Sequence, residues 1–105
     1  MGVDVVWKDA TDRELDRALD SPGWLAQAIN QAQDARRTDV PVLVSIDLYG
    51  DTRIFAPRTD SLATELATVR AETLNPEARV HLGRVMTLAN AASAQPGTYL
   101  LCVGD

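Results

Sequence analysis

The stretch VPVLVSIDLYGDTRIFA, residues 40–56, is the part of the sequence that decides the expected fold. Residues 40–48 carry the strongest strand signal of the chain, because β-branched and aliphatic side chains dominate them. Residues 49–52, Tyr-Gly-Asp-Thr, predict a tight turn, since Gly-Asp suits a two-residue hairpin loop. Residues 52–56 are expected to form the returning strand, which Pro57 ends. The stretch therefore predicts a β-hairpin.

The pairing of the two hairpin strands is open at this stage. A two-residue loop places Leu48 opposite Arg53. A three-residue loop places Ile46 opposite Ile54 instead. It also places Asp47 opposite Arg53, which matches the apolar and charged faces better. Turn chemistry favours the first register and residue patterning the second, and we favour the second.

One strand and two helices are expected before the hairpin. Residues 3–7 alternate as a strand. Residues 11–14, Thr-Asp-Arg-Glu, have the form of a capping box and predict a short helix of about two turns that includes Leu19. Ser21 as N-cap and Pro22 at the first helical position begin a second helix. The apolar stripe of that helix is Leu25, Ala28, Ile29 and Ala32.

Two further helices are expected after the hairpin. A cap at Thr59 or Asp60 begins the first of them. Asn75 as cap and Pro76 at the first position begin the second. Residues 79–88 fit both helical and strand spacing, but the alanine-rich sequence around them favours a helix.

Residues 98–103 predict a last strand that is central or covered on both faces, because it is almost wholly apolar. With one helical layer for each long connection, the expected order is βαββαβ. The predicted fold class is α+β, a four-stranded, largely antiparallel sheet with helices packed on one face. Residues 1–105 are expected to form a single domain.

Composition excludes several classes of protein. The chain has 105 residues, of which 46% are hydrophobic and 24% charged, as in a globular domain. Its net charge of −5 opposes binding to nucleic acid. No apolar stretch approaches the roughly 20 residues that span a bilayer. The lone Cys102 and the absence of a signal peptide predict a cytoplasmic protein.

The residues that could act in catalysis or bind a metal are more simply explained by structural roles. His81 is the only histidine and has no metal ligand at a suitable spacing, so we expect a structural role. Cys102 lies inside a predicted strand and is expected to be a small core residue. Asp47 and Asp51 could bind a cation or form an acid–base pair, but turn roles explain both. We expect no enzyme, no metal and no cofactor, since phosphate-binding loops, nucleophile elbows and zinc signatures are missing.

The hairpin also offers the strongest candidate contact patch. Tyr49 at its tip and Phe55 on the return strand are expected to be exposed beside Arg53. Tyrosine and arginine are enriched among residues that dominate binding energy at interfaces. We therefore predict that Tyr49, Asp51, Arg53, Phe55 and Asp47 contact a partner protein.

Acidic residues concentrate at the start of the chain, which carries Asp4, Asp9, Asp12, Glu14, Asp16 and Asp20. A solvated surface explains them, and an acidic face that docks on a basic partner is the sharper interpretation. The resulting hypothesis is a small bacterial inhibitor of the immunity-protein or antitoxin type, whose partner is a basic toxin or enzyme. The alternative is a homodimer or other accessory domain, or a small-ligand-binding domain, since Val42, Val44, Ile46 and Leu48 give one strand an apolar face.

Overall fold

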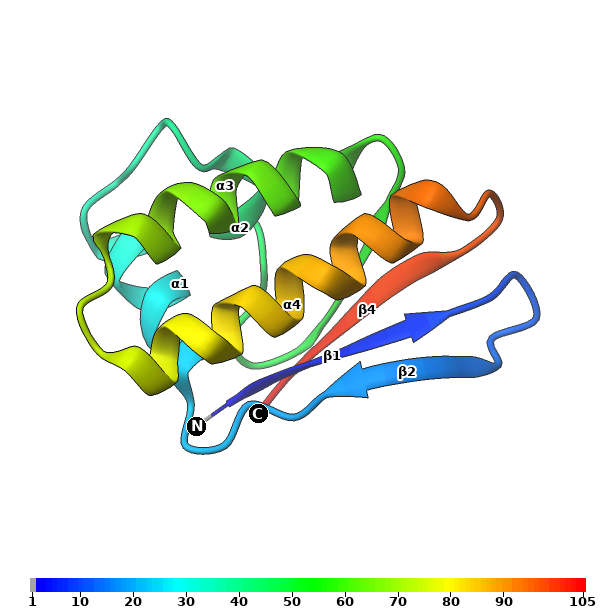
Figure 1. Cartoon of the computed structure of the whole chain (residues 1–105), viewed down its shortest axis with the longest axis horizontal. Helices are drawn as coiled ribbons and strands as arrows, with labels where there is room; N and C mark the ends of the chain where they lie inside the picture. Colours follow the sequence, from blue (N-terminus) through cyan, green and yellow to red (C-terminus); the bar gives the residue numbers. More distant parts are fainter. Residues whose placement is uncertain (1) are drawn as a thin grey trace.

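Four antiparallel strands form one sheet in the order β2-β1-β4-β3 in the computed structural model, which describes residues 2–105 (Figure 1). The elements along the chain are β1 (Val3–Lys8), β2 (Glu14–Ala18), α1 (Trp24–Asp34), α2 (Pro41–Val44), β3 (Asp51–Phe55), α3 (Arg58–Glu72), α4 (Pro76–Ala94) and β4 (Tyr99–Gly104). The α+β class with an antiparallel sheet is confirmed. The order differs from the expected one, because two strands precede the first helix.

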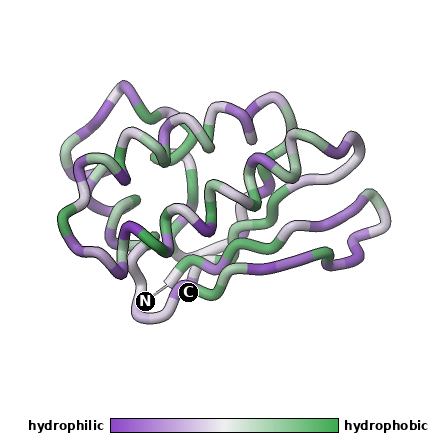
Figure 2. Tube along the Cα trace, viewed as in Figure 1, coloured by the Kyte–Doolittle hydropathy of each residue, from purple (hydrophilic) through white to green (hydrophobic). Residues whose placement is uncertain are grey.

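The helices cover one face of the sheet and leave the other without a covering layer. Val3, Val5, Ile54, Leu100 and Cys102 point into the main core beneath α1, α3 and α4. A smaller cluster of Val6, Tyr99 and Leu101, with Val103 beside it, lies on the opposite face, which we call the outer face. Hydrophobic residues concentrate along β1 and β4, whereas β2 and the turn before it are mostly hydrophilic (Figure 2). The predicted central position of β4 is confirmed.

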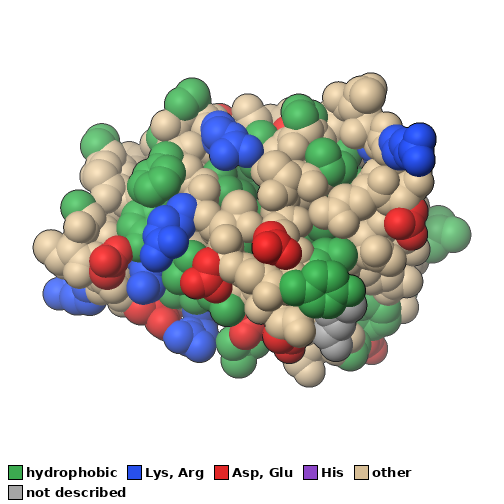
Figure 3. Space-filling model, turned by 180° about the vertical axis from the view of Figure 1, so that it is seen from behind, with side chains coloured by type: hydrophobic (Ala, Val, Ile, Leu, Met, Phe, Trp, Pro, Cys, Tyr) green, Lys and Arg blue, Asp and Glu red, His purple; other side chains and the backbone are tan. Residues whose placement is uncertain are grey.

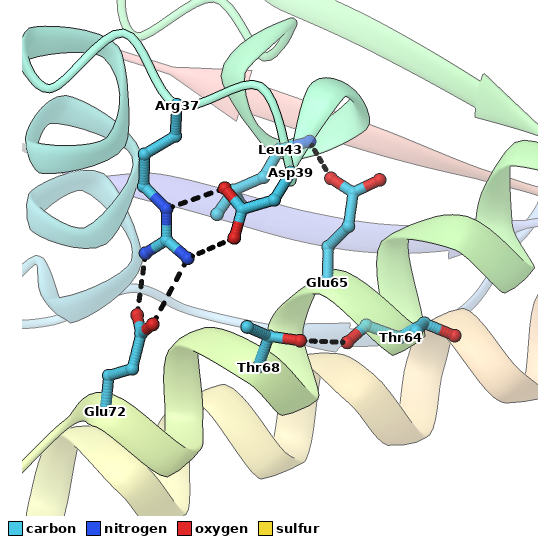
Figure 4. Close-up of polar contacts among 7 residues, drawn as sticks. All are labelled: Arg37, Asp39, Leu43, Thr64, Glu65, Thr68 and Glu72. Carbon is cyan, nitrogen blue, oxygen red and sulfur yellow. Dashed lines mark hydrogen bonds and ion pairs between the residues drawn. The ribbon is translucent and has the colours of Figure 1, made fainter.

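The expected strand over residues 40–48 is wrong, and with it the hairpin and both of its registers. Residues 41–44 form the short helix α2, and β3 pairs with β4 instead. The reason is a residue far along the chain, because the Glu65 carboxylate of α3 accepts a hydrogen bond from the Leu43 N–H (Figure 4). It also accepts one from the Val42 N–H. These bonds cap the first turn of α2, where Pro41 needs no acceptor.

The remaining backbone of this stretch is also satisfied by a side chain. The Gln33 amide donates to the carbonyl oxygens of Val44 and Ile46, both at 3.1 Å. Ile46 and Leu48 are buried although neither lies in a strand. The apolar pattern of residues 40–48 thus reflects burial of a short helix and a loop against the rest of the fold. These residues do not form the apolar strand face that was expected to support self-association.

The expected helix after residues 11–14 is wrong as well. The Asp9 carboxylate accepts from the N–H groups of Thr11 and Arg13, which folds this segment into a turn. The Glu14 carboxylate binds Arg17 instead of reaching back to the helix start. Residues 14–18 therefore form β2, which pairs with β1.

The helix boundaries are partly as expected. α1 begins at Trp24 after Gly23, not at Pro22, and α3 begins at Arg58, before the predicted caps. The Asn75 side chain accepts from two N–H groups in the first turn of α4, so this cap is confirmed. Residues 79–88 are helical, as favoured. Within residues 2–105, no helix has the length and apolar character needed to cross a membrane.

Candidate functional site

Three of the predicted contact residues lie together on β3. Asp51, Arg53 and Phe55 alternate along this strand and stand on the outer face of the sheet, opposite Val103, Leu101 and Tyr99 of β4. All three are exposed, and 54% of Phe55 is accessible to solvent. On the side of the molecule turned away in Figure 1, hydrophobic side chains lie among acidic and basic ones (Figure 3). The outer face thus combines apolar area with charge.

The other two predicted residues lie just before β3. The Asp47 carboxylate accepts from the Tyr49 N–H at 2.9 Å, and the Asp47 N–H donates to the Thr52 hydroxyl. Asp47 therefore shapes the turn and does not face Arg53, so the predicted pairing of these two residues is wrong. Tyr49 is 70% exposed, two residues before the strand.

A groove of about 520 Å³ adjoins Arg53 and Phe55. It lies between the ends of β3 and β4 and the turn between β1 and β2, and Asp12 and Gly97 contribute to its walls. The rings of Phe55 and Tyr99 stack in its floor, with centroids 5.1 Å apart and planes at 29°. The groove is therefore lined by two stacked aromatic rings together with an arginine and an aspartate.

Tyr99 and Asp12 also line the groove, although the sequence predicts Asp12 only as part of the early acidic face and Tyr99 only as part of a strand. The Tyr99 hydroxyl donates a short hydrogen bond to the Asp12 carboxylate. This bond and burial raise the pKa of Tyr99, while the neighbouring Arg53 acts in the opposite direction. Tyr99 could have been found from its strand, since alternation places residues 99, 101 and 103 on one face. No local signal brings Asp12 to it across 87 positions.

The basic and acidic side chains near the groove differ in whether they have an intramolecular partner. Within residues 2–105, no acidic side chain lies at ion-pair distance from Arg53. The six acidic residues near the start of the chain, in contrast, all accept intramolecular hydrogen bonds. Each early acid thus has a hydrogen-bond partner within the fold, and Arg53 is a cation beside the groove that has no ion pair among residues 2–105.

His81 has a buried carboxylate neighbour that the sequence analysis did not foresee. Its Nε2 lies 3.1 Å from Asp20 Oδ1, an ion-pair distance without the alignment of a hydrogen bond. Asp20 also accepts from the N–H groups of Val3, Leu25 and Ala26, each at 2.9 Å. Burial acts to raise the pKa of Asp20, but His81 and these N–H groups outweigh it and lower the pKa. The pair joins β1 and the start of α1 to α4.

Cys102 lies in the buried centre of β4 as expected. Burial raises the pKa of its thiol to about 12, so the reactive thiolate is suppressed at neutral pH. Across the described residues 2–105, no group of three or more His, Cys, Asp and Glu side chains is arranged to hold a metal ion.

A second cleft of about 550 Å³ lies between α1 and the turn from α3 to α4, with Trp24 and Leu74 in its lining. At its border the Arg37 guanidinium binds Asp39 and Glu72 at 2.6 Å each (Figure 4). These contacts raise the pKa of Arg37 and lower that of Asp39. Since its guanidinium is shared by two carboxylates, Arg37 is less available to a ligand than Arg53.

Comparison with known proteins yields no family model, no curated protein and no solved structure that matches this chain.

Proposed function

We propose that this protein is a small, non-catalytic binding module that inhibits a partner protein, in the manner of a bacterial immunity protein or antitoxin. The observation that carries the proposal is the groove on the outer face, where Arg53 and Phe55 are exposed beside the stacked ring of Tyr99. Aromatic and arginine side chains next to a pocket are typical of the few residues that dominate binding energy.

The partner is expected to be basic. The chain carries a net charge of −5, Asp12 lines the groove, and Asp51 is exposed further along the same outer face. Opposite net charges speed the encounter of two proteins and make the association rate depend on salt. An apolar side chain of the partner would fill the groove, and an acidic group at its border would pair with Arg53. The single cysteine is consistent with a reducing cytoplasm as the site of action.

The test is capture of partners from the native lysate with the tagged protein, two groove variants and one control variant. Arg53→Ala and Phe55→Ala remove the exposed side chains of the groove and should lower recovery of a stoichiometric basic partner at least about tenfold. Val80→Ala is the matched control, because Val80 is 70% exposed on α4 and lies outside the groove. Recovery of a foreign partner that all three variants bind equally would remove the groove from the mechanism.

A homo-oligomeric accessory domain is the second candidate. It is favoured by a separate observation, the unprotected edge of β3, which is developed in the next subsection.

A further inference from the structure

The two edges of the sheet differ in how their backbone groups are satisfied. β2 forms one edge, where the Arg17 N–H donates to the Asp16 carboxylate at 2.8 Å and the Arg17 carbonyl accepts from Arg84 at 3.0 Å. Charged side chains that bind an edge strand prevent another chain from pairing with it. The β2 edge is therefore closed.

β3 forms the opposite edge and lacks such protection. The Gly104 N–H donates to the Gly50 carbonyl at 2.9 Å, so these two residues form a hydrogen-bonded pair between β3 and β4. This pair determines which residues of β3 direct their backbone groups towards β4. Because backbone groups alternate in direction along an antiparallel strand, those of Asp51, Arg53 and Phe55 point away from β4. Among residues 2–105, no other segment hydrogen-bonds to them. The β3 edge is a free template for a further strand.

The sequence of this edge is complementary to itself. Residues 49–55 read YGDTRIF, with Thr52 at the centre. When two copies pair antiparallel about Thr52, Asp51 of each copy lies opposite Arg53 of the other. Both residues direct their backbone groups to the edge, so the charge-matched pairs are also the hydrogen-bonded pairs.

The neighbouring registers lack this match. Pairing about Arg53 places the two guanidinium groups opposite each other and Asp51 opposite Phe55. Pairing about Ile54 places Asp51 opposite Pro57, which has no N–H to donate. Like charges directly opposite destabilise a sheet, whereas opposite charges stabilise it. The charges therefore select the register about Thr52.

We propose that a second copy of this chain pairs with β3 in that register and joins the two sheets into one. This inference goes beyond the proposed inhibitor function and does not depend on it. Backbone groups of β3 point along the sheet, whereas the side chains that line the groove stand out of it. The dimer would place two grooves on one continuous outer face, with Arg53 of each copy beside Asp51 of the other.

The experiment compares the mass of the whole chain with that of charge variants by sedimentation equilibrium, from about 10 μM to about 1 mM, the range where small interfaces dissociate. Asp51→Arg and Arg53→Asp each place like charges opposite one another at two symmetric positions. Each should weaken the dimer by roughly tenfold or more. The double variant D51R/R53D restores opposite charges in this register and should recover the wild-type dissociation constant.

Two controls carry the same charge changes on exposed positions outside β3. Asp34→Arg at the end of α1 matches Asp51→Arg, and Arg13→Asp in the first turn matches Arg53→Asp; neither should change the dissociation constant. Circular dichroism of every variant separates loss of pairing from loss of folding. In the wild type, the amide protons of Asp51 and Arg53 should become protected from hydrogen exchange as concentration rises.

Three results would overturn the inference. A wild type that stays at 11.4 kDa throughout excludes the dimer. A dimer that tolerates both single reversals lies elsewhere on the molecule. Folded single variants that dissociate without rescue by the double variant exclude the register about Thr52. A monomeric wild type that still captures a foreign partner through Phe55 would leave the proposed inhibitor function intact, so the two proposals can fail separately.

Discussion

Substitution of Asp20 should be among the most damaging single changes in this protein. The carboxylate is completely buried and joins three parts of the chain. It accepts from the N–H group of Val3 in β1, from those of Leu25 and Ala26 in α1, and lies against His81 of α4. An alanine at this position leaves three buried donors without an acceptor and the imidazole without its partner.

The size of the effect follows from these contacts. A hydrogen bond to a charged group contributes about 1.5–3 kcal/mol, and breaking a buried charged pair costs about 3–5 kcal/mol in all. We expect Asp20→Ala to lower the free energy of unfolding by about 4 kcal/mol. Asp20→Asn keeps one oxygen acceptor but turns an amide N–H₂ towards the Leu25 N–H or His81, so we expect a loss of about 2 kcal/mol. Asp34→Asn, on an exposed residue, should stay within about 0.5 kcal/mol of wild type.

The same contacts set the pH dependence. The pKa of Asp20 is lowered in the folded protein from its ordinary value of 3.8, so the ionised form stabilises the fold. This contribution is present in full above the unfolded pKa and is lost as the pH falls through the lower folded pKa. The difference in unfolding free energy between wild type and Asp20→Asn should therefore shrink below a pH of about 4. Asp9, Glu14, Asp16 and Asp39 titrate in both proteins, so their effects cancel in the difference.

The assay is urea unfolding followed by circular dichroism at pH 7, pH 5 and pH 3, for the wild type and the three variants. The reasoning fails if Asp20→Asn is as stable as wild type at pH 7. It also fails if the difference between the two proteins is the same at pH 5 and pH 3, an interval below the usual pKa of a histidine.

Three further predictions address the packing around β4 and α2. Gly104→Ala should lower the free energy of unfolding by about 1–3 kcal/mol, because its Cβ would lie 2.4 Å from the Leu48 carbonyl. An unchanged melting temperature would contradict this contact. Glu65→Ala should cost about 2–3 kcal/mol in a urea melt, since two buried N–H groups of α2 lose their acceptor, and Glu65→Gln should cost less. Cys102 should resist a thiol reagent at pH 8 in the native protein and react in urea, because burial raises its pKa to about 12. Rapid reaction of the native protein with the reagent would show that β4 opens.

The parts of the fold that could be predicted are those decided by neighbouring residues. Asn75 followed by Pro76 fixes the start of α4, because the cap and the missing N–H act within one turn. The stripe of α1 buries Leu25, Ile29 and Ala32, as its helical spacing requires. β4 is apolar on both faces and lies between two strands. Local chemistry is sufficient in these elements.

The elements that were predicted wrongly are those whose backbone N–H groups bind side chains from outside the segment. Residues 41–44 are helical because Glu65, 22 positions beyond Leu43, accepts from their N–H groups. A burial pattern alone does not distinguish such a segment from a strand, since both hide aliphatic side chains. Residues 11–14 match the sequence pattern of a capping box, but the Thr11 and Arg13 N–H groups donate to the Asp9 carboxylate instead. In both cases a polar side chain outside the segment decides the conformation.

Three of the predicted contact residues lie on one face of β3, although the hairpin from which they were predicted does not exist. Asp51, Arg53 and Phe55 share a face because alternate residues of any strand do so, whichever strand lies beside it. Asp47 was assigned through the missing partner strand and lies in the turn instead. Loss of the hairpin also has a structural consequence, because a strand over residues 40–48 would have covered the edge of β3. The error in the fold and the open edge therefore have the same cause: residues 40–48 form α2 and a loop instead of a strand beside β3, so within residues 2–105 no backbone group pairs with that of Arg53.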